Sequence, residues 1–328
     1  MDLGFEQAGF DVGAAFDIRP DAVASYNYNL ASSAARIADI RTLKAVDVEN
    51  VMGTPFGIIG GPPCQSFSIA NSSQYGKDPR HRLPFRYARL ITDLNRSNRV
   101  AFFVFENVPG LLSKKYSHRF ALLKAALTRA GFNITCCILD AKDYGVPQTR
   151  QRLFIVGINR RLYRDLFWQP PSPSRSASPM SVRAAIGGLP EPTYFSDYSP
   201  GDVLPFHPNH WCMTPKSRKF ERKGALVSGR SSNRSFKVLS WEKPSLTVSY
   251  GNREVHVHPD CHRRLSVFEA MRLQGFPDSY ALQGTLSSQI TQISEAVPPP
   301  LARAVAESLK WQLAQAEEAA SIGLKVGL

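Results

Sequence analysis

The residues best placed for chemistry follow the short apolar run 56–59, where two glycines and two prolines lead into Cys64. The run has the length of a buried strand bounded by breakers, and Pro62 and Pro63 end it because they donate no backbone hydrogen bond. Cys64 is therefore predicted at the carboxyl end of a strand, where open α/β sheets place their ligands and a thiolate can act as a nucleophile. A lone cysteine is more often a small buried hydrophobe, but glycines and prolines make a poor core sequence.

Glu106 ends a second apolar run, 100–105, which reads as a buried parallel strand. A carboxylate at the end of such a strand costs desolvation energy unless it is paired or functional. Glu106 could also cap the helix that follows, and the residue pattern alone leaves both roles open.

Two arginines precede a third apolar run, 153–157. Arg150 and Arg152 alternate with Gln148, so all three side chains point to one side if the segment is extended. They could serve a common site, and salt bridging on the surface is the alternative.

Asp17 follows a strand expected at 12–16 and precedes a helix with Pro20 in its first turn. An acidic residue at the end of the second strand of a nucleotide-binding unit commonly binds ribose hydroxyls. On periodicity alone, Asp17 is equally suited to capping the helix.

Taken in chain order, these segments resemble the DNA (cytosine-5) methyltransferase family, and the resemblance covers nearly the whole chain. The motifs that carry it are Pro63-Cys64-Gln65, Glu106-Asn107-Val108, Gln148-Thr149-Arg150-Gln151-Arg152 and Arg272-Leu273-Gln274-Gly275-Phe276-Pro277. The resemblance implies an α/β fold, namely a Rossmann-like domain dependent on S-adenosyl-L-methionine with a smaller, irregular target-recognition domain.

The resemblance also implies catalytic roles for four residues. Cys64 would add to carbon 6 of a cytosine flipped out of the DNA helix, which makes carbon 5 nucleophilic toward the methyl group of S-adenosylmethionine. Glu106 would bond N3 and the exocyclic amine of the base, and Arg152 would hold its O2. Arg150 would support the site or contact a phosphate.

Cofactor-binding positions follow from the same resemblance. Asp17 matches the acidic ribose-binding position, Ile18 the residue that packs on adenine, and Asp39 the residue that contacts the adenine amino group. The remaining matched positions are Ile40, Pro63, Leu83 and Glu295.

The sequence departs from the family pattern at two places. The family opens with a strand and a Phe-x-Gly-x-Gly-Gly loop, whereas segment 1–10 resembles the helix after that loop. We therefore expect about a dozen residues, a strand and its turn, to be absent, which would expose the edges of neighbouring strands. Ser294 and Glu295 also replace the family's Gly and Asn. Two alternatives follow: a catalytically impaired DNA-binding homologue, or an RNA cytosine-5 methyltransferase.

A Pro- and Ser-rich stretch, 168–179, is typical of a linker. We predict a catalytic and cofactor-binding domain over 1–171, a target-recognition domain over 172–288, and a C-terminal segment over 289–328 that returns to the first domain.

Two segments are strongly basic. The segment 77–89 is expected to be a surface loop that closes over DNA. Basic residues also outnumber acidic ones between 216 and 237, which favours a DNA-facing recognition loop, with a disordered tail as the alternative.

The segment before the last family motifs holds two local patterns. Ser266 and Glu269 have the spacing of a capping box at the start of a helix. A zinc hypothesis arises just ahead of them, from His256, His258, Cys261 and His262. Ligands this close in sequence cannot easily surround one tetrahedral ion, so we expect no metal.

Composition narrows the class of protein. The chain has 328 residues, 43% of them hydrophobic, and a net charge of +13, so we expect a folded protein with a polyanionic partner, double-stranded DNA. Five cysteines without a repeating spacing favour a reducing compartment over a disulfide framework. No secretory signal or membrane span is evident, which predicts the bacterial cytoplasm, in association with the nucleoid. We further expect a monomer, with a cognate restriction endonuclease as a candidate partner.

Overall fold

The computed structural model describes residues 1–30, 35–62, 82–97, 99–173, 179–199, 201–230, 236–247 and 256–325. The predicted nucleophile Cys64, the predicted cofactor-lining residue Pro63 and the first part of the basic segment 77–89 lie outside the described residues.

A four-stranded sheet forms the centre of the molecule, in the order β3, β4, β7, β5 (Gly57–Gly60, Phe102–Asn107, Gln151–Asn159 and Phe132–Asp140). β3 runs parallel to β4, and β7 runs antiparallel to both of its neighbours. Every residue of β4 is buried, which confirms the strand predicted from its uninterrupted apolar run.

A second, separate pair of parallel strands is formed by β1 (Ala15–Asp17) and β2 (Ala35–Ile37). α2 (Pro20–Asn29) connects them and has Pro20 in its first turn, as predicted. α3 (Ala45–Met52) follows β2 and leads into β3. The sequence analysis predicted neither β2 nor α3, and it placed the start of β1 three residues too early.

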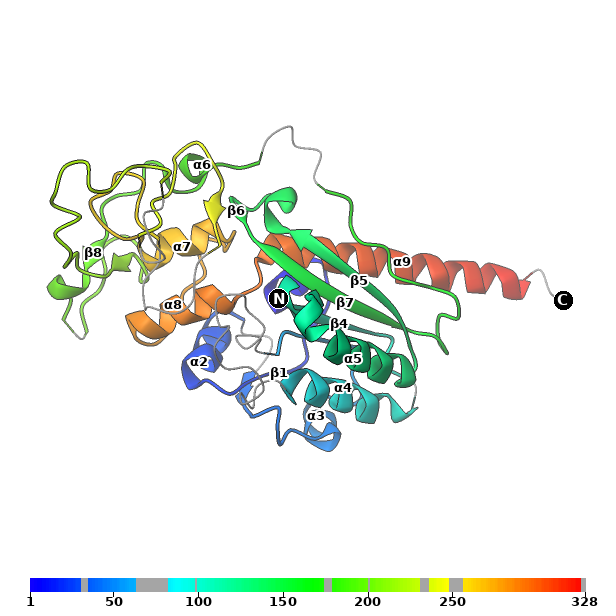
Figure 1. Ribbon diagram of the computed structural model, residues 1–328. Helices are drawn as coiled ribbons and strands as arrows, with labels where there is room; N and C mark the ends of the chain where they lie inside the picture. The colour runs from blue at the N-terminus through cyan, green and yellow to red at the C-terminus, as the bar shows by residue number, and fades with distance from the viewer. Residues whose placement is uncertain are drawn as a thin grey trace.

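Helices cover both faces of the central sheet (Figure 1). Phe102 and Val104 of β4 point into one apolar core, and Phe103 and Phe105 point into the other, because successive side chains of a strand alternate. The helices of the first face are α1 (Asp2–Gln7) and α9 (Pro299–Lys325), and those of the second are α4 (Leu83–Leu94) and α5 (Ser117–Arg129). Short 3₁₀ turns occupy Asn95–Ser97, Pro109–Leu112, Lys114–Tyr116, Ala141–Tyr144 and Phe195–Asp197.

Residues 83–89 of the basic segment belong to α4, so the prediction of a surface loop is wrong for them. Arg86 and Arg89 are exposed on the solvent side of this helix. Its opposite side packs on the second core through apolar residues at helical spacing, which are Leu83, Tyr87, Ala88, Ile91 and Leu94.

The last helix, α9, is longer than the segment 301–314 predicted from the sequence. Leu301, Val305 and Leu309 are fully buried against the sheet, whereas Trp311 is 65% exposed. Within the described ranges, no helix, α9 included, combines the length and apolarity that crossing a bilayer requires.

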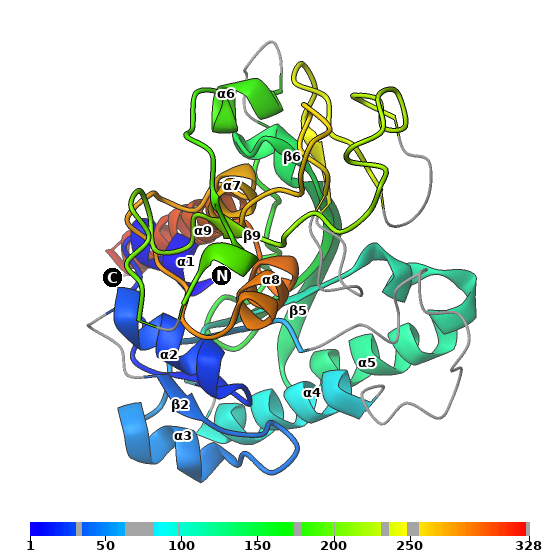
Figure 2. The same cartoon turned by 90° about the vertical axis from the view of Figure 1, so that its left-hand side faces the viewer.

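A loop-rich segment lies at one end of the molecule, above α7 and α8 (Figures 1 and 2). Trp211 and Phe268 belong to its own apolar core, which also includes residues of the three helices. Pairing of β10 with β6 joins this segment to the catalytic half of the chain. Its elements are α6 (Val182–Ile186), β8 (Thr193–Tyr194), β9 (Trp211–Cys212), β10 (Ser245–Leu246), α7 (Val267–Leu273) and α8 (Leu286–Glu295), and β6 spans Gln148–Thr149.

The capping box predicted at the start of α7 is confirmed. The Ser266 hydroxyl accepts the backbone N–H of Glu269 at 3.0 Å, and the Glu269 carboxylate accepts the N–H of Ser266 at 2.7 Å. Arg263 donates two further hydrogen bonds to the same buried carboxylate, at 2.9 and 3.0 Å. Because Glu269 is buried and fully paired, it fixes the start of α7 in the core.

Candidate active site

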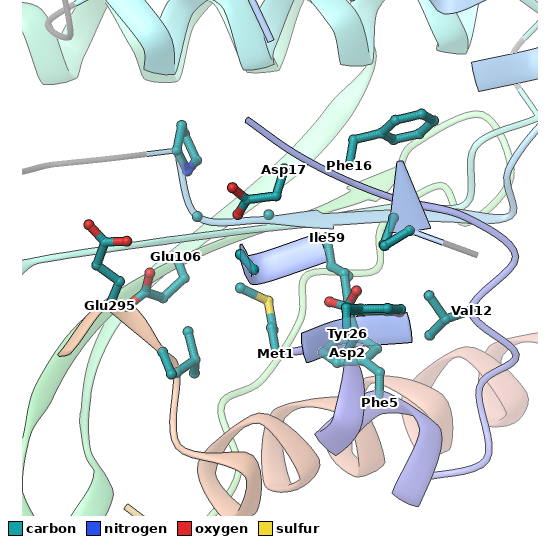
Figure 3. Close-up of a pocket in the computed structure, with 18 of the residues that line it drawn as sticks. Met1, Asp2, Phe5, Val12, Phe16, Asp17, Tyr26, Ile59, Glu106 and Glu295 are labelled. Carbon is teal, nitrogen blue, oxygen red and sulfur yellow. The ribbon is translucent and has the colours of Figure 1, made fainter. Parts of the chain in front are cut away.

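A cavity of about 1450 Å³ opens at the carboxyl ends of β1, β3 and β4 (Figure 3). It reaches from α2 and α3 on one side to the end of α8 on the other. Among the predicted site residues, those that line it are Asp17, Ile18, Asp39, Ile40, Leu83, Glu106, Arg152 and Glu295. Eight residues scattered over most of the chain are thus brought to one place, as expected for ligand sites in open α/β sheets.

Glu106 and Arg152 form the most buried charged pair of this cavity. Arg152 Nε lies 2.9 Å from Glu106 Oε1, and the side chains are only 12% and 10% exposed. Burial raises the pKa of the Glu106 carboxyl, and the Arg152 guanidinium partly opposes that rise. The site therefore holds a carboxyl that keeps its proton more readily than an exposed glutamate does, beside a fixed guanidinium.

Gly61, directly after β3, passes close over Glu106. A side chain at this position would place its Cβ 2.8 Å from Glu106 Oε2, which is nearer than atoms of real side chains approach. Only glycine lets the loop toward Cys64 begin this near to the carboxyl. The sequence analysis assigned Gly61 to the turn and missed this contact.

Arg150 is fully buried and does not line the cavity. Its Nη2 donates hydrogen bonds to the backbone carbonyls of Ser294, at 2.7 Å, and Ala296, at 2.8 Å. It therefore holds the end of α8, which carries Glu295 into the cavity. This placement favours the supporting role among the two that the resemblance implied.

Ser294 fits its position without backbone strain. Its hydroxyl donates to the carbonyl of Ile290 at 2.8 Å within α8. Among the described residues, the only residue other than glycine with a positive φ is Cys261. A serine in place of the family's glycine is therefore compatible with this fold.

Glu295 has a partner that the sequence analysis missed. Arg19 Nη2 lies 2.6 Å from Glu295 Oε2, and each side chain is 33% exposed. Arg19 also donates its backbone N–H to Asp17 Oδ1 at 2.8 Å. The ion pair joins the start of α2 to the end of α8 across the rim of the cavity, and its position directly after Ile18 was the one signal in the sequence.

We expect Arg19 and Glu295 to be energetically coupled. In a double-mutant cycle of Arg19→Met and Glu295→Gln, measured by urea unfolding, the coupling should be about 0.2–1 kcal/mol, since the pair is partly exposed. It should shrink as salt is raised from 0.05 to 0.5 M. Additive effects of the two substitutions at low salt would contradict this ion pair.

The other cofactor positions lie on the α3 side of the cavity. Asp39 Oδ2 accepts Arg41 Nε at 2.7 Å and Oδ1 accepts the Arg41 backbone N–H at 2.9 Å, and these bonds lower the pKa of Asp39. Ile18 is 53% exposed toward solvent and Leu83 is 8% exposed. Ile40 packs against the second core. The group presents one fixed carboxylate among apolar side chains.

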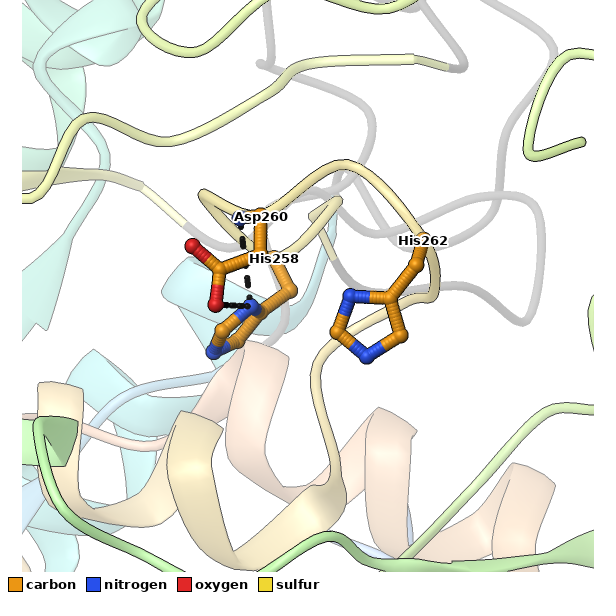
Figure 4. A group of neighbouring side chains, drawn as sticks. All are labelled: His258, Asp260 and His262. Carbon is orange, nitrogen blue, oxygen red and sulfur yellow. Dashed lines mark hydrogen bonds and ion pairs between the residues drawn. The ribbon is translucent and has the colours of Figure 1, made fainter. Parts of the chain in front are cut away.

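The zinc hypothesis rests on a loop far from this cavity in sequence (Figure 4). His256 Nε2 bonds the carbonyl of Thr247 at 2.9 Å, away from the other ligands. The ligand atoms of His258, Asp260 and His262 lie within 4.8 Å of one another. His258 Nδ1 already accepts the Asp260 N–H, and His262 Nε2 lies 3.2 Å from Glu191. Hydrogen bonds inside the loop account for this arrangement.

Comparisons with known proteins agree with this geometry. A model of the C-5 cytosine-specific DNA methylase family matches residues 1–311. The Type II methyltransferase M.MthTI of Methanothermobacter thermautotrophicus is 33% identical and the alignment covers 95% of this chain and 94% of that protein. The Type II methyltransferase M.DdeI of Desulfomicrobium norvegicum is 32% identical, over 94% of this chain and 85% of that protein.

Solved structures share the architecture. A candidate DNA modification methyltransferase encoded within an E. coli prophage has a TM-score of 0.78 at 26% identity, over 95% of each chain. The Dnmt2 methyltransferase of S. pombe has a TM-score of 0.61 at 20% identity, over 96% of this chain and 95% of that one. The predicted Rossmann-like α/β fold is confirmed. With a family match that spans nearly its whole length, the chain belongs to the C-5 cytosine-specific DNA methylase family.

Proposed function

We propose that the protein transfers a methyl group from S-adenosylmethionine to carbon 5 of a flipped-out cytosine in double-stranded DNA, through a covalent adduct with Cys64. The observation that carries the proposal is the buried pair of Glu106 and Arg152, which faces the cavity that Asp17 also lines. A carboxyl and a guanidinium held side by side suit the N3, amine and O2 edge of cytosine.

The residues on the α2 and α3 side fit the adenosine part of S-adenosylmethionine. Asp17 presents a carboxylate that is 44% exposed at the end of β1, which suits ribose hydroxyls. Ile18 offers an apolar surface for the adenine ring, and Asp39 is held by Arg41 where it can accept from an amino group. When bound, the cofactor supplies an electrophilic methyl group on a sulfonium.

The protein's own residues would then act on the base. The Cys64 thiolate forms a bond to carbon 6 while the electron pair of the 5,6 double bond moves to carbon 5. Glu106 stabilises the charge that reaches N3, and Arg152 binds O2. After carbon 5 has taken the methyl group, loss of its proton and departure of the Cys64 sulfur restore the ring as 5-methylcytosine.

The raised pKa of Glu106 supports its part in these steps. A neutral carboxyl can donate a hydrogen bond to N3 of cytosine, whereas a carboxylate can only accept. Burial favours the neutral form, and Arg152 limits how far it does so. Glu106 would thus share a proton with N3 as negative charge develops on the ring.

The wider setting is proposed from the same reasoning. Residues 1–171 would form the catalytic and cofactor-binding domain, 172–288 the target-recognition domain, and 289–328 the returning segment. The protein would act as a monomer on DNA in the bacterial cytoplasm, in association with the nucleoid. Its relatives M.MthTI and M.DdeI are named Type II methyltransferases, so a restriction endonuclease of matching specificity is the partner we propose.

The test is methyl transfer from labelled S-adenosylmethionine to duplex DNA, with structured tRNA assayed beside it. We expect the duplex to be labelled and the alkaline hydrolysate to contain 5-methylcytosine. Preferential labelling of tRNA would favour an RNA methyltransferase. DNA binding without transfer would favour an impaired homologue, for which Glu295 in the place of an asparagine is the motivating observation.

A further inference from the structure

Two strand edges open onto the same cavity without a partner strand. In the part of the chain that the structure describes, β1 pairs only with β2, and β3 pairs only with β4. All residues of β1 and β3 line the cavity, and Figure 3 shows Phe16 of β1 and Ile59 of β3 beside it. Each strand therefore presents a row of backbone N–H and C=O groups that can pair with another strand.

The two strands end at the same side of the cavity. Arg19, just after β1, pairs with Glu295, and Gly61, just after β3, passes over Glu106. Figure 3 shows Asp17, Glu106 and Glu295 grouped at this end. A strand between β1 and β3 could therefore run parallel to both, as β2 and β4 already do on their outer edges.

The space is larger than one small ligand needs. The cavity measures about 1450 Å³, whereas ligand pockets typically measure about 300–1,000 Å³. β3 has four residues, and a strand of this length spans roughly 13 Å. The cavity can thus hold a short strand between β1 and β3 in addition to a cofactor at their carboxyl ends.

From these edges we propose that the slot between β1 and β3 binds one further strand, parallel to both and joined to Met1. Met1 lines the same cavity and lies beside Glu106 in Figure 3, at the carboxyl ends of the strands. A strand that ends there can enter α1 through a tight turn without crossing the molecule. It would join the two-stranded and four-stranded sheets into one.

The flanking layers define the chemistry of this strand. α1 and α9 cover one face of the sheet beside the slot, and α4 covers the other. A parallel strand buried on both faces is apolar at successive positions rather than at alternate ones. The occupant is therefore a run of four or so aliphatic residues, and the turn after it needs small residues because Gly61 and Glu106 already crowd that end.

The test attaches such a strand to the whole chain. The segment Lys-Val-Ile-Val-Leu-Ser-Gly-Ser-Gly is fused in front of Met1, and the matched control replaces its Ile with Pro, which removes one N–H and clashes with strand pairing. Hydrogen exchange is followed in peptides covering 14–17 and 56–61. With the aliphatic strand we expect exchange in both peptides to slow at least about ten-fold relative to the control, and the melting temperature to rise by a few degrees.

Equal exchange in the two fusions, or slowing at β1 or β3 alone, would overturn the proposal. The readout is backbone protection, so it does not depend on methyl transfer. A fusion that protects both strands yet fails to methylate DNA would leave the slot established and count only against the proposed function.

Discussion

Replacing Cys64 with alanine is expected to lower turnover by at least about 10⁴-fold, because no other group would form the bond to carbon 6 that activates carbon 5. Duplex binding should stay within about two-fold, since phosphate contacts supply most of the affinity for DNA. The measurements are initial rates with labelled S-adenosylmethionine and gel-shift titrations of the same preparations. A duplex with 5-fluorocytosine at the target should also trap the unaltered protein as a complex stable to denaturant, because fluorine cannot leave as a proton does.

Cys136→Ala is the matched control for this substitution. Cys136 lies on β5 and packs against the second core, and burial raises the pKa of its thiol, so it is a poor source of thiolate. We expect this variant to keep the unaltered rate and the trapped complex. If Cys64→Ala retained its rate, or still trapped fluorinated DNA, the nucleophile would be misassigned.

The features that sequence predicted well are local ones. β4 was predicted because an apolar run buried on both faces has few alternatives, and the capping box at Ser266 because its spacing is fixed by one helical turn. The convergence of Asp17 and Glu106 followed from a general rule, since parallel strands end at one edge of a sheet. Each of these rests on a few consecutive residues.

The features that sequence missed depend on distant partners. β7 lies between β4 and β5 with the opposite direction, and nothing in 151–159 encodes which strands it will meet. The short strand β2 has two exposed residues of three, so it has no apolar pattern to find. The pairing of Arg19 with Glu295, and the hold of Arg150 on the end of α8, join opposite ends of the chain. Only the folded chain brings such pairs together.

Glu106→Gln is expected to lower the rate of methyl transfer by about 10²–10³-fold, within the range for loss of a general acid. Glutamine keeps the shape of the side chain and can donate a hydrogen bond to N3, but it cannot share a proton as charge develops there. Single-turnover rates with saturating DNA separate this step from binding. The matched control is Glu242→Gln, because Glu242 is paired with Arg183 on the surface with its side chain 70% exposed, and it should leave the rate unchanged.

The pH dependence of these rates distinguishes a proton donor from a residue that only positions the base. Burial raises the pKa of Glu106, so its neutral form is present in full at low pH and is lost as pH rises through the raised value. The unaltered protein should therefore lose activity on that alkaline limb, and Glu106→Gln should lose the limb along with most of the rate, when both are measured between pH 5.5 and about 9. A variant that kept the same limb would assign it to another group. A variant that kept more than a tenth of the rate would leave Glu106 with a positioning role alone, because a neutral amide at its place would then do nearly as well as a carboxyl.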